Sequence, residues 1–139
     1  MIYFLDTSVV VAILRNRPPL ARDRLRRALA RKSRISVSSI VLYELQYGVE
    51  RSSRHRENAE QLGAFLSGDI DVVPFDDEDA ATAATLRAML ADSGKPIGPY
   101  DLLIAAQALR RGAVLVTSNG SEFARVRELA WQDWTASRR

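Results

Sequence analysis

The chain has 139 residues, carries a formal net charge of +3 and contains no cysteine. Without cysteine it can form neither a disulfide framework nor a thiolate metal site. A chain of this length buries about two-thirds of its unfolded surface on folding, so we expect a single domain over residues 1–139.

Nothing in the sequence indicates a membrane protein. The N-terminus has no basic region, and Asp6 interrupts its only apolar run, so we expect no signal peptide. No uncharged run is long enough to cross a bilayer. We therefore predict a soluble, cytoplasmic protein that does not associate with membranes.

The charge is unevenly distributed along the chain. Residues 15–34 contain nine Lys or Arg side chains and one acid, Asp23, so this segment carries +8 and the rest of the chain sums to −5. Such a segment suggests a polyanionic partner. The alternative is an arginine-rich helix face that only contacts solvent.

Short apolar, β-branched runs alternate with longer amphipathic stretches, which predicts an α/β fold. The expected strands are residues 2–5, 34–38, 71–74 and 113–117, with a fifth, edge strand within residues 129–134. The expected helices are residues 9–14, 20–32, 40–48, 57–66, 80–91, 100–111 and 121–128, the first of them capped by Thr7 or Ser8. This alternation predicts a mostly parallel sheet of four or five strands with helices on both faces. We expect the basic C-terminal end to be disordered.

Asp6 ends the first predicted strand. A buried parallel strand delivers the residue that follows it to the carboxyl edge of the sheet, where ligands bind in open α/β folds. Asp6 is therefore a candidate site residue. The alternative is that Asp6 simply caps or ends the strand.

Glu44 lies on an otherwise apolar helix stripe, with Ile40, Val41 and Tyr47 as its helical neighbours. Burying an unpaired carboxylate costs on the order of several kcal/mol, so Glu44 needs a partner. It either reaches the same sheet edge as Asp6, or it extends to solvent or pairs with an arginine.

Two further acids lie in the first turns of predicted helices. If Gly98 is an N-cap, Asp101 occupies position N3, and Glu122 follows the strand that ends at Thr117. An acid in a first turn stabilises a helix by about 0.3–1 kcal/mol, so capping is an alternative role for both. The same effect accounts for the acids at residues 76–79, which we assign to capping rather than to catalysis.

Four acids are thus candidates for one catalytic site: Asp6, Glu44, Asp101 and Glu122. Two carboxylates about 5 Å apart repel each other by roughly 3 kcal/mol at an effective dielectric constant near 20, so a shared site requires a cation. Carboxylates without cysteine and with one histidine select Mg²⁺ or Mn²⁺ over Zn²⁺. Such metals activate water and polarise phosphoryl oxygens, so the acids and the basic segment together predict metal-dependent phosphodiester hydrolysis.

Uncharged and basic side chains complete the predicted site. The residues predicted to position water or a phosphate oxygen are Thr7, Thr117, Ser118 and Asn119. The residues of the basic segment predicted to bind the polyanionic partner, which the resemblance described next implies to be RNA, are Arg22, Arg26 and Lys32.

The sequence resembles the PIN-domain ribonucleases of the VapC toxin type, which belong to toxin–antitoxin modules. Four segments, spread over nearly the whole chain, carry the resemblance: residues 5–8 (LDTS), 43–50 (YELQYGVE), 97–106 (IGPYDLLIAA) and 116–126 (VTSNGSEFARV). Each segment alone is a weak signal, but the four in the family's order are specific.

The resemblance implies an α/β/α sandwich around a parallel sheet and an Mg²⁺- or Mn²⁺-dependent endoribonuclease acting on structured RNA, such as tRNA or rRNA loops. Asp6, Glu44 and Asp101 match the family's three central, metal-binding acids, and Glu122 matches a less uniform fourth. Ser118 departs from the asparagine that is usual in the family. The resemblance also implies a homodimer and a cognate antitoxin that blocks the active-site groove.

Three alternatives compete with this interpretation. A phospho-accepting receiver domain requires adjacent acids after the first strand, whereas Asp6 is followed by Thr7. A haloacid-dehalogenase-like phosphatase requires a second acid where Ser8 stands. An RNA-binding PIN domain that no longer cleaves is disfavoured because the acids are intact.

Overall fold

The computed structural model describes residues 1–136, and its five strands form one parallel sheet. The strands are β1 (Ile2–Leu5), β2 (Arg34–Ser38), β3 (Ile70–Val73), β4 (Val114–Val116) and β5 (Trp131–Gln132). Their order across the sheet is β3-β2-β1-β4-β5, and each neighbouring pair is parallel. The predicted parallel sheet is therefore confirmed, including its edge strand near the C-terminus. The C-terminal end predicted to be disordered lies partly outside the described residues.

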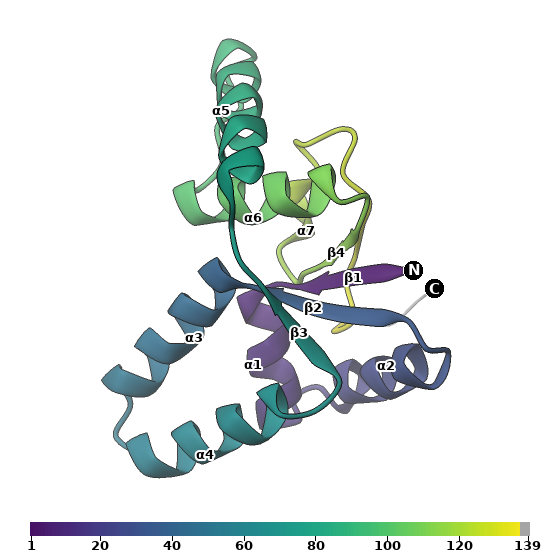
Figure 1. The fold of residues 1–139 in the computed structure, drawn as a ribbon, viewed down its shortest axis with the longest axis vertical. Coiled ribbons are helices and arrows are strands. Elements are labelled where there is room, and N and C mark those ends of the chain that lie inside the picture. The colour runs from purple at the N-terminus through teal and green to yellow at the C-terminus, as the bar shows by residue number, and fades with distance from the viewer. Residues whose placement is uncertain (137–139) are drawn as a thin grey trace.

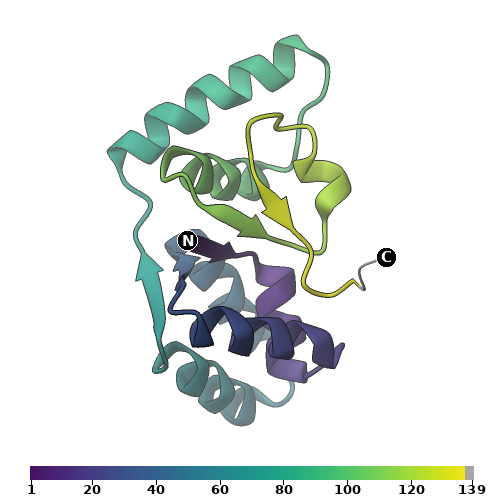
Figure 2. The ribbon, with the colours of Figure 1, turned by 90° about the vertical axis from the view of Figure 1, so that its right-hand side faces the viewer.

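Seven helices within residues 1–136 cover the sheet (Figures 1 and 2). They are α1 (Thr7–Arg15), α2 (Pro19–Ala30), α3 (Ser39–Arg51), α4 (His55–Leu66), α5 (Asp77–Asp92), α6 (Pro99–Arg110) and α7 (Gly120–Phe123). Helices α1 to α4 lie on one face and α5 to α7 on the other, which gives the expected three layers. Among these described helices, none has the length and hydropathy needed to cross a membrane.

The order in which the chain adds strands to the sheet reverses beside β1: β2 and β3 are added on one side of it, and β4 and β5 on the other. The strands β2 and β4 flank β1 on opposite sides, and the chain reaches them over opposite faces of the sheet (Figure 1). Phe4, Leu5 and Leu115 are almost fully buried there, as expected for strands covered on both faces. In open α/β sheets ligands bind at the carboxyl ends of the strands beside such a reversal.

β1 passes into α1 without a loop, and the N-cap of α1 is Asp6. The prediction that Thr7 or Ser8 caps this helix is wrong, because Asp6 Oδ1 accepts a hydrogen bond from the Thr7 N–H at 2.8 Å. The Asp6 carbonyl already accepts hydrogen bonds from the N–H groups of Val9 and Val10, both at 3.1 Å. The helix therefore begins immediately after the strand residue Leu5.

The helix predicted over residues 121–128 is shorter than expected and ends at Phe123. The buried side chains beyond it, Val126 and Leu129, recur at every third position after Phe123. The N–H of Val126 donates to the Phe123 carbonyl at 3.0 Å, and that of Leu129 to the Val126 carbonyl at 3.1 Å. A spacing of three matches successive tight turns rather than the α-helical repeat of about 3.6 residues.

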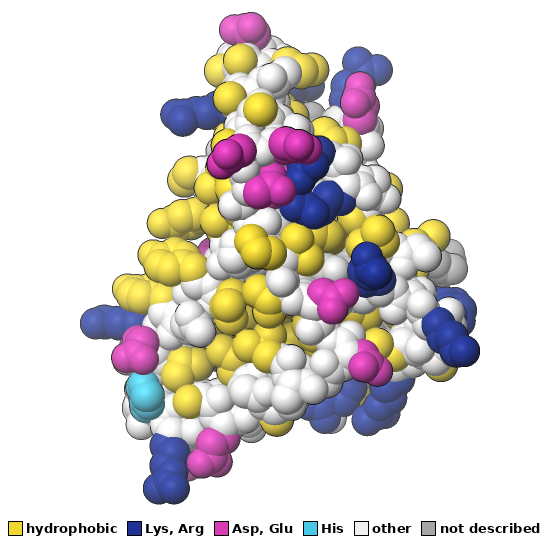
Figure 3. Space-filling model, viewed as in Figure 1, with side chains coloured by type: hydrophobic (Ala, Val, Ile, Leu, Met, Phe, Trp, Pro, Cys, Tyr) yellow, Lys and Arg dark blue, Asp and Glu magenta, His cyan; other side chains and the backbone are white. Residues whose placement is uncertain are grey.

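The acids at residues 76–79 cap α5, as predicted. The Asp79 N–H donates to Asp76 Oδ1, and the Asp76 N–H donates to Asp79 Oδ2, both at 2.9 Å, which forms a reciprocal capping box. Figure 3 shows acidic and basic side chains together at this end of α5. The acids therefore also take part in ion pairs.

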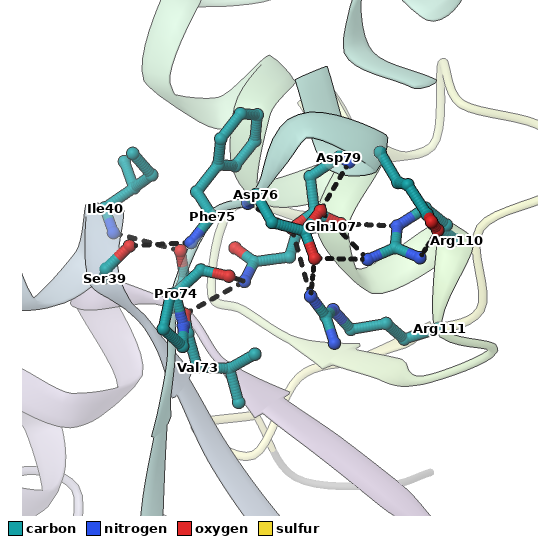
Figure 4. A network of polar contacts seen from close by, with 12 residues as sticks. Ser39, Ile40, Val73, Pro74, Phe75, Asp76, Asp79, Gln107, Arg110 and Arg111 are labelled. Carbon is teal, nitrogen blue, oxygen red and sulfur yellow. Dashed lines mark hydrogen bonds and ion pairs between the residues drawn. The ribbon is translucent and has the colours of Figure 1, made fainter. Parts of the chain in front are cut away.

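The ion pairs fasten α5 to the C-terminal end of α6 (Figure 4). Arg110 Nε lies 2.7 Å from Asp79 Oδ1, and Arg111 Nη2 lies 3.1 Å from Asp79 Oδ2. Burial alone raises the pKa of Asp79, but the hydrogen bonds from the Asp76 backbone and the two arginines hold it below its ordinary value. The buried Gln107 amide also donates to the Val73 carbonyl at 3.0 Å. These contacts fix α6, and hence Asp101 in its first turn, against the sheet.

We predict that Asp79→Ala lowers the free energy of unfolding by about 3 kcal/mol, because it leaves two arginines without their buried partner. Asp77→Ala is the matched control, since Asp77 is exposed in the same helical turn, and it should change stability by less than about 0.5 kcal/mol. Urea unfolding near neutral pH measures both variants. Equal losses in the two variants would contradict the structural role given to Asp79.

Candidate active site

The four predicted acids come from four different elements and gather at the carboxyl edge of the sheet. Asp6 ends β1, Glu44 lies in the second turn of α3, Asp101 in the first turn of α6 and Glu122 in α7. The charges of the other three raise the pKa of Asp101, which places all four within electrostatic reach of one another. The structure therefore brings the predicted set together.

Asp6 is 6% exposed, and both of its carboxylate oxygens accept hydrogen bonds. Oδ1 accepts from the Thr7 N–H and Oδ2 from the Thr117 hydroxyl, each at 2.8 Å. Burial raises the pKa of Asp6, these two hydrogen bonds oppose that rise, and the charges of Glu44 and Glu122 add to it. Asp6 is thus both a candidate site residue and a helix cap, a role that the sequence analysis gave to Thr7 or Ser8.

Thr7 links Asp6 to Glu44. Its backbone N–H donates to Asp6, and its hydroxyl donates to Glu44 Oε1 at 2.8 Å. Within residues 1–136 Glu44 forms no ion pair, so no arginine neutralises this carboxylate. The half-buried Glu44 instead points from its apolar helix stripe to the same edge as Asp6.

Asp101 and Glu122 form a pair with opposite pKa shifts. Burial, followed by the charges of Asp6 and Glu122, raises the pKa of Asp101 to about 7. Glu122 Oε1 accepts the Gly98 N–H at 2.6 Å, and Oε2 accepts Asn119 Nδ2 at 2.8 Å, and the Gly98 bond is the main reason that the pKa of Glu122 is lowered. Near neutral pH Asp101 is therefore about half protonated in the metal-free site, whereas the lowered pKa of Glu122 keeps that carboxylate ionised.

Glu122 caps the N-terminus of α6, whereas Asp101, which lies in the first turn of that helix, does not. The Gly98 N–H at the start of α6 is bound by Glu122, which lies 24 residues away, and no side chain from within α6 caps its N-terminus. Asp101 is left facing the other acids.

The polar residues at the end of β4 hold the acids in place. The Thr117 hydroxyl donates to Asp6 and accepts the Asn119 N–H at 3.0 Å. Asn119 then donates to Glu122, while the Ser118 N–H donates to the Ser8 hydroxyl at 3.3 Å. Thr7, Thr117 and Asn119 therefore orient carboxylates in this structure. Their predicted role in positioning water or phosphate, and that of Ser118, stays a prediction.

Two tyrosines that the prediction omitted stand beside the acids. Tyr43 immediately precedes Glu44, and Tyr100 immediately precedes Asp101. Their rings are tilted by 56° with centroids 5.8 Å apart, and their exposed fractions are 52% and 45%. The signal was available in the sequence, because each tyrosine adjoins a candidate acid on a predicted helix.

The predicted RNA-binding residues lie on or just after α2, and within residues 1–136 none of them pairs with the four acids. Arg22 Nη2 donates to the Ile13 carbonyl at 2.7 Å, and Arg26 lies 3.5 Å from Asp23. Lys32 follows the helix in the left-handed conformation, with φ of 60°. Two of the three side chains therefore already contact other parts of this chain.

The donor set of the acidic edge suits a hard divalent cation. Within residues 1–136, no Lys or Arg forms an ion pair with any of the four acids. The available donors are carboxylate and hydroxyl oxygens, which Mg²⁺ and Mn²⁺ prefer. No three acidic or histidine side chains in this described part are already gathered at coordination distance. A bound cation would therefore have to draw the carboxylates inward against their mutual repulsion.

Comparison with known proteins identifies a family for this arrangement. The PIN domain family matches residues 3–129. The chain is 36% identical over 133 residues to the tRNA(fMet)-specific endonuclease VapC of Shigella flexneri, covering 96% of this chain and 98% of that relative. It is 39% identical over 134 residues to ribonuclease VapC2 of Rickettsia felis, covering 96% of this chain and 98% of that relative.

The fold is also similar to a solved complex. The crystal structure of VapBC2 from Rickettsia felis, bound to a DNA fragment from its promoter, superposes with a TM-score of 0.90 at 36% identity. The match covers 96% of this chain and 99% of that one. Family, sequence relatives and fold agree, and the chain belongs to the PIN-domain family as a member of its VapC group.

Proposed function

We propose that this protein is a metal-dependent endoribonuclease and the toxin of a toxin–antitoxin module. The observation that carries the proposal is the gathering of four carboxylates, from four elements, with no cationic side chain paired to them in residues 1–136. Such uncompensated charge is costly without a cation, so it is expected where a divalent metal binds. The names of the VapC relatives support ribonuclease activity.

Asp6, Glu44 and Asp101 would hold the Mg²⁺ or Mn²⁺ ion, and Glu122 would support Asp101 from the side. The ion, when bound, would supply Lewis-acid polarisation of a phosphoryl oxygen and activation of a water. Thr7 and Thr117 keep the Asp6 carboxylate in one orientation, which reduces the rearrangement needed to bind the ion.

The substrate class follows from the surroundings of the acids. Unpaired bases stack on aromatic side chains, and the exposed Tyr43 and Tyr100 rings lie beside Glu44 and Asp101. This favours single-stranded loops in structured RNA, such as those of tRNA or rRNA. The tRNA(fMet) named for the Shigella flexneri relative makes tRNA the first substrate to test.

The proposed assembly has two protein partners in the cytoplasm. The similar VapBC structures are complexes named for both components, which supports a cognate antitoxin for this chain. We propose that the antitoxin blocks the groove above the acids and that the toxin forms a homodimer.

Cleavage of tRNA by the purified protein should require Mg²⁺ or Mn²⁺ and should stop in EDTA. Asp101→Asn should reduce the rate by at least about a hundredfold, because it removes a metal-binding charge while preserving the shape of the side chain. Asp77→Asn is the matched control, since Asp77 also lies in the first turn of a helix but away from the site. Cleavage that is equal with and without EDTA, from protein free of contaminating nuclease, would contradict metal dependence.

The metal-free site should also make stability depend on pH. The pKa of Asp101 is about 7 when folded and near 3.8 in its ordinary state, so its protonated form favours folding, and this contribution is lost as pH rises towards about 7. Asp101→Asn cannot lose that proton. In EDTA it should match the wild type only at or below about pH 3.8, gain on it progressively as pH rises to about 7, and be more stable by roughly 1–3 kcal/mol near pH 8, after allowance for solvent screening.

Thermal melting across this pH range measures the difference, again with Asp77→Asn as control. Mg²⁺ should raise the melting temperature of the wild type through binding to the folded state, with little effect on Asp101→Asn. If Asp101→Asn instead melts lower than the wild type at every pH, Asp101 stabilises its helix and does not share a repulsive site.

A further inference from the structure

A groove lies between α2 and the C-terminal segment that begins with β5. Figure 2 shows α2 beside this segment. The groove has a volume of about 470 Å³ and is lined by Arg24 and Arg27 of α2, by Arg31 at the C-cap of that helix, and by Trp131 and Asp133 of the C-terminal segment. We call it the α2–β5 groove. None of its residues belongs to the acidic edge.

The three arginines form a cationic row along this groove. They are spaced three and four residues apart, so they share one face of α2 and span roughly 10 Å along its axis, at about 1.5 Å per residue. The Arg24 guanidinium donates to the Asp133 carbonyl, which anchors this end of the row. The described residues 1–136 offer no carboxylate within ion-pair distance of Arg24, Arg27 or Arg31.

The one acid in the groove does not neutralise this row. The Asp133 carboxylate accepts hydrogen bonds from the Thr135 N–H at 2.8 Å and from the Thr135 hydroxyl at 2.6 Å. By contrast, Arg26 on the outer face of α2 pairs with Asp23. The uncompensated positive charge of α2 is therefore concentrated on the face that lines the groove.

The groove is rigidly connected to the acidic edge. The Gln132 carbonyl accepts the N–H of Thr117 at 2.9 Å, and the Thr117 hydroxyl binds Asp6. The Trp131 ring also packs directly on Gly120, so closely that a Cβ there would lie 2.3 Å from the ring. β5, which forms one wall of the groove, is therefore bonded directly to the end of β4, where Thr117 holds Asp6.

We propose that the α2–β5 groove binds the sugar–phosphate backbone of the RNA substrate beside the bond that is cut, an inference that rests on the proposed ribonuclease function. A row of about 10 Å matches roughly three nucleotides at about 3.4 Å per nucleotide of a stacked strand. A positive groove next to an exposed aromatic ring is the combination that single-stranded nucleic acids use, and Trp131 is 38% exposed here. An acidic protein segment is the competing occupant.

The test compares the two faces of the same helix. Arg27→Ala/Arg31→Ala removes two charges from the groove, and Arg26→Ala/Lys32→Ala removes two from the outer face; all four side chains are exposed. Both pairs are made in an Asp101→Asn background so that RNA stays intact. The probe is unfractionated bacterial tRNA, fluorescently labelled at its 3′ end, and its dissociation constant is measured over a range of salt concentrations.

The groove variant should bind tRNA on the order of tenfold more weakly, and its plot of log affinity against log salt should be shallower by about 1.4–1.8, as expected for two lost phosphate contacts. The outer-face variant should retain both affinity and slope, contrary to the prediction from the sequence that Arg26 and Lys32 bind RNA. Arg27→Lys/Arg31→Lys should restore the slope because it restores the charge. Circular dichroism melting checks that the variants are equally folded.

Equal losses in the two double variants would overturn the proposal, because they would mean that only net charge matters. Unchanged tRNA binding together with weakened antitoxin binding would assign the groove to an acidic protein partner and would also overturn it. Failure of the ribonuclease proposal is seen separately, as absence of cleavage by the protein with intact Asp101, whereas this test reads binding alone.

Discussion

Everything at the candidate site depends on how one buried carboxylate is held. Asp6 stands where β1 becomes α1, and its two oxygens are fixed by the Thr7 N–H and the Thr117 hydroxyl. The parallel pairing of β1 with β4 brings Thr117 beside Asp6, and Thr7 extends the contact to Glu44. The sheet thereby sets both the position and the orientation of the first acid, and the other acids approach it from helices that pack on opposite faces.

The cost of this arrangement is electrostatic. With no ion pair to relieve the four acids in residues 1–136, the metal-free protein lowers its charge by keeping a proton on Asp101, whose pKa is about 7. Glu122 stays ionised because the Gly98 N–H and Asn119 bind its carboxylate. The ion pairs of Asp79 with Arg110 and Arg111 fasten the C-terminal end of α6 to α5. The helix that carries Asp101 is therefore anchored at the end opposite the four acids.

Much of this could be predicted from the sequence, because local patterns dictate it. An aspartate that ends an apolar strand and a glutamate on an apolar helix stripe both indicate the same sheet edge, and Gly98-Pro99 marks the start of α6. Contacts between distant segments were not predictable. Nothing local indicates that Glu122 binds the Gly98 N–H. Arginines are spread around the part of α2 that is not buried, so only packing against the C-terminal segment reveals which of them line a groove. The same limitation hid the end of α7 at Phe123, since its cause lies in which later side chains are buried.

The most direct test of the shared-site account is anomalous X-ray diffraction from crystals of the protein soaked in Mn²⁺. The account predicts one strong manganese peak bounded by the carboxylates of Asp6, Glu44 and Asp101, and no such peak in crystals of Asp101→Asn. A manganese peak elsewhere, or none at this edge in protein that cleaves RNA in Mn²⁺, would contradict it.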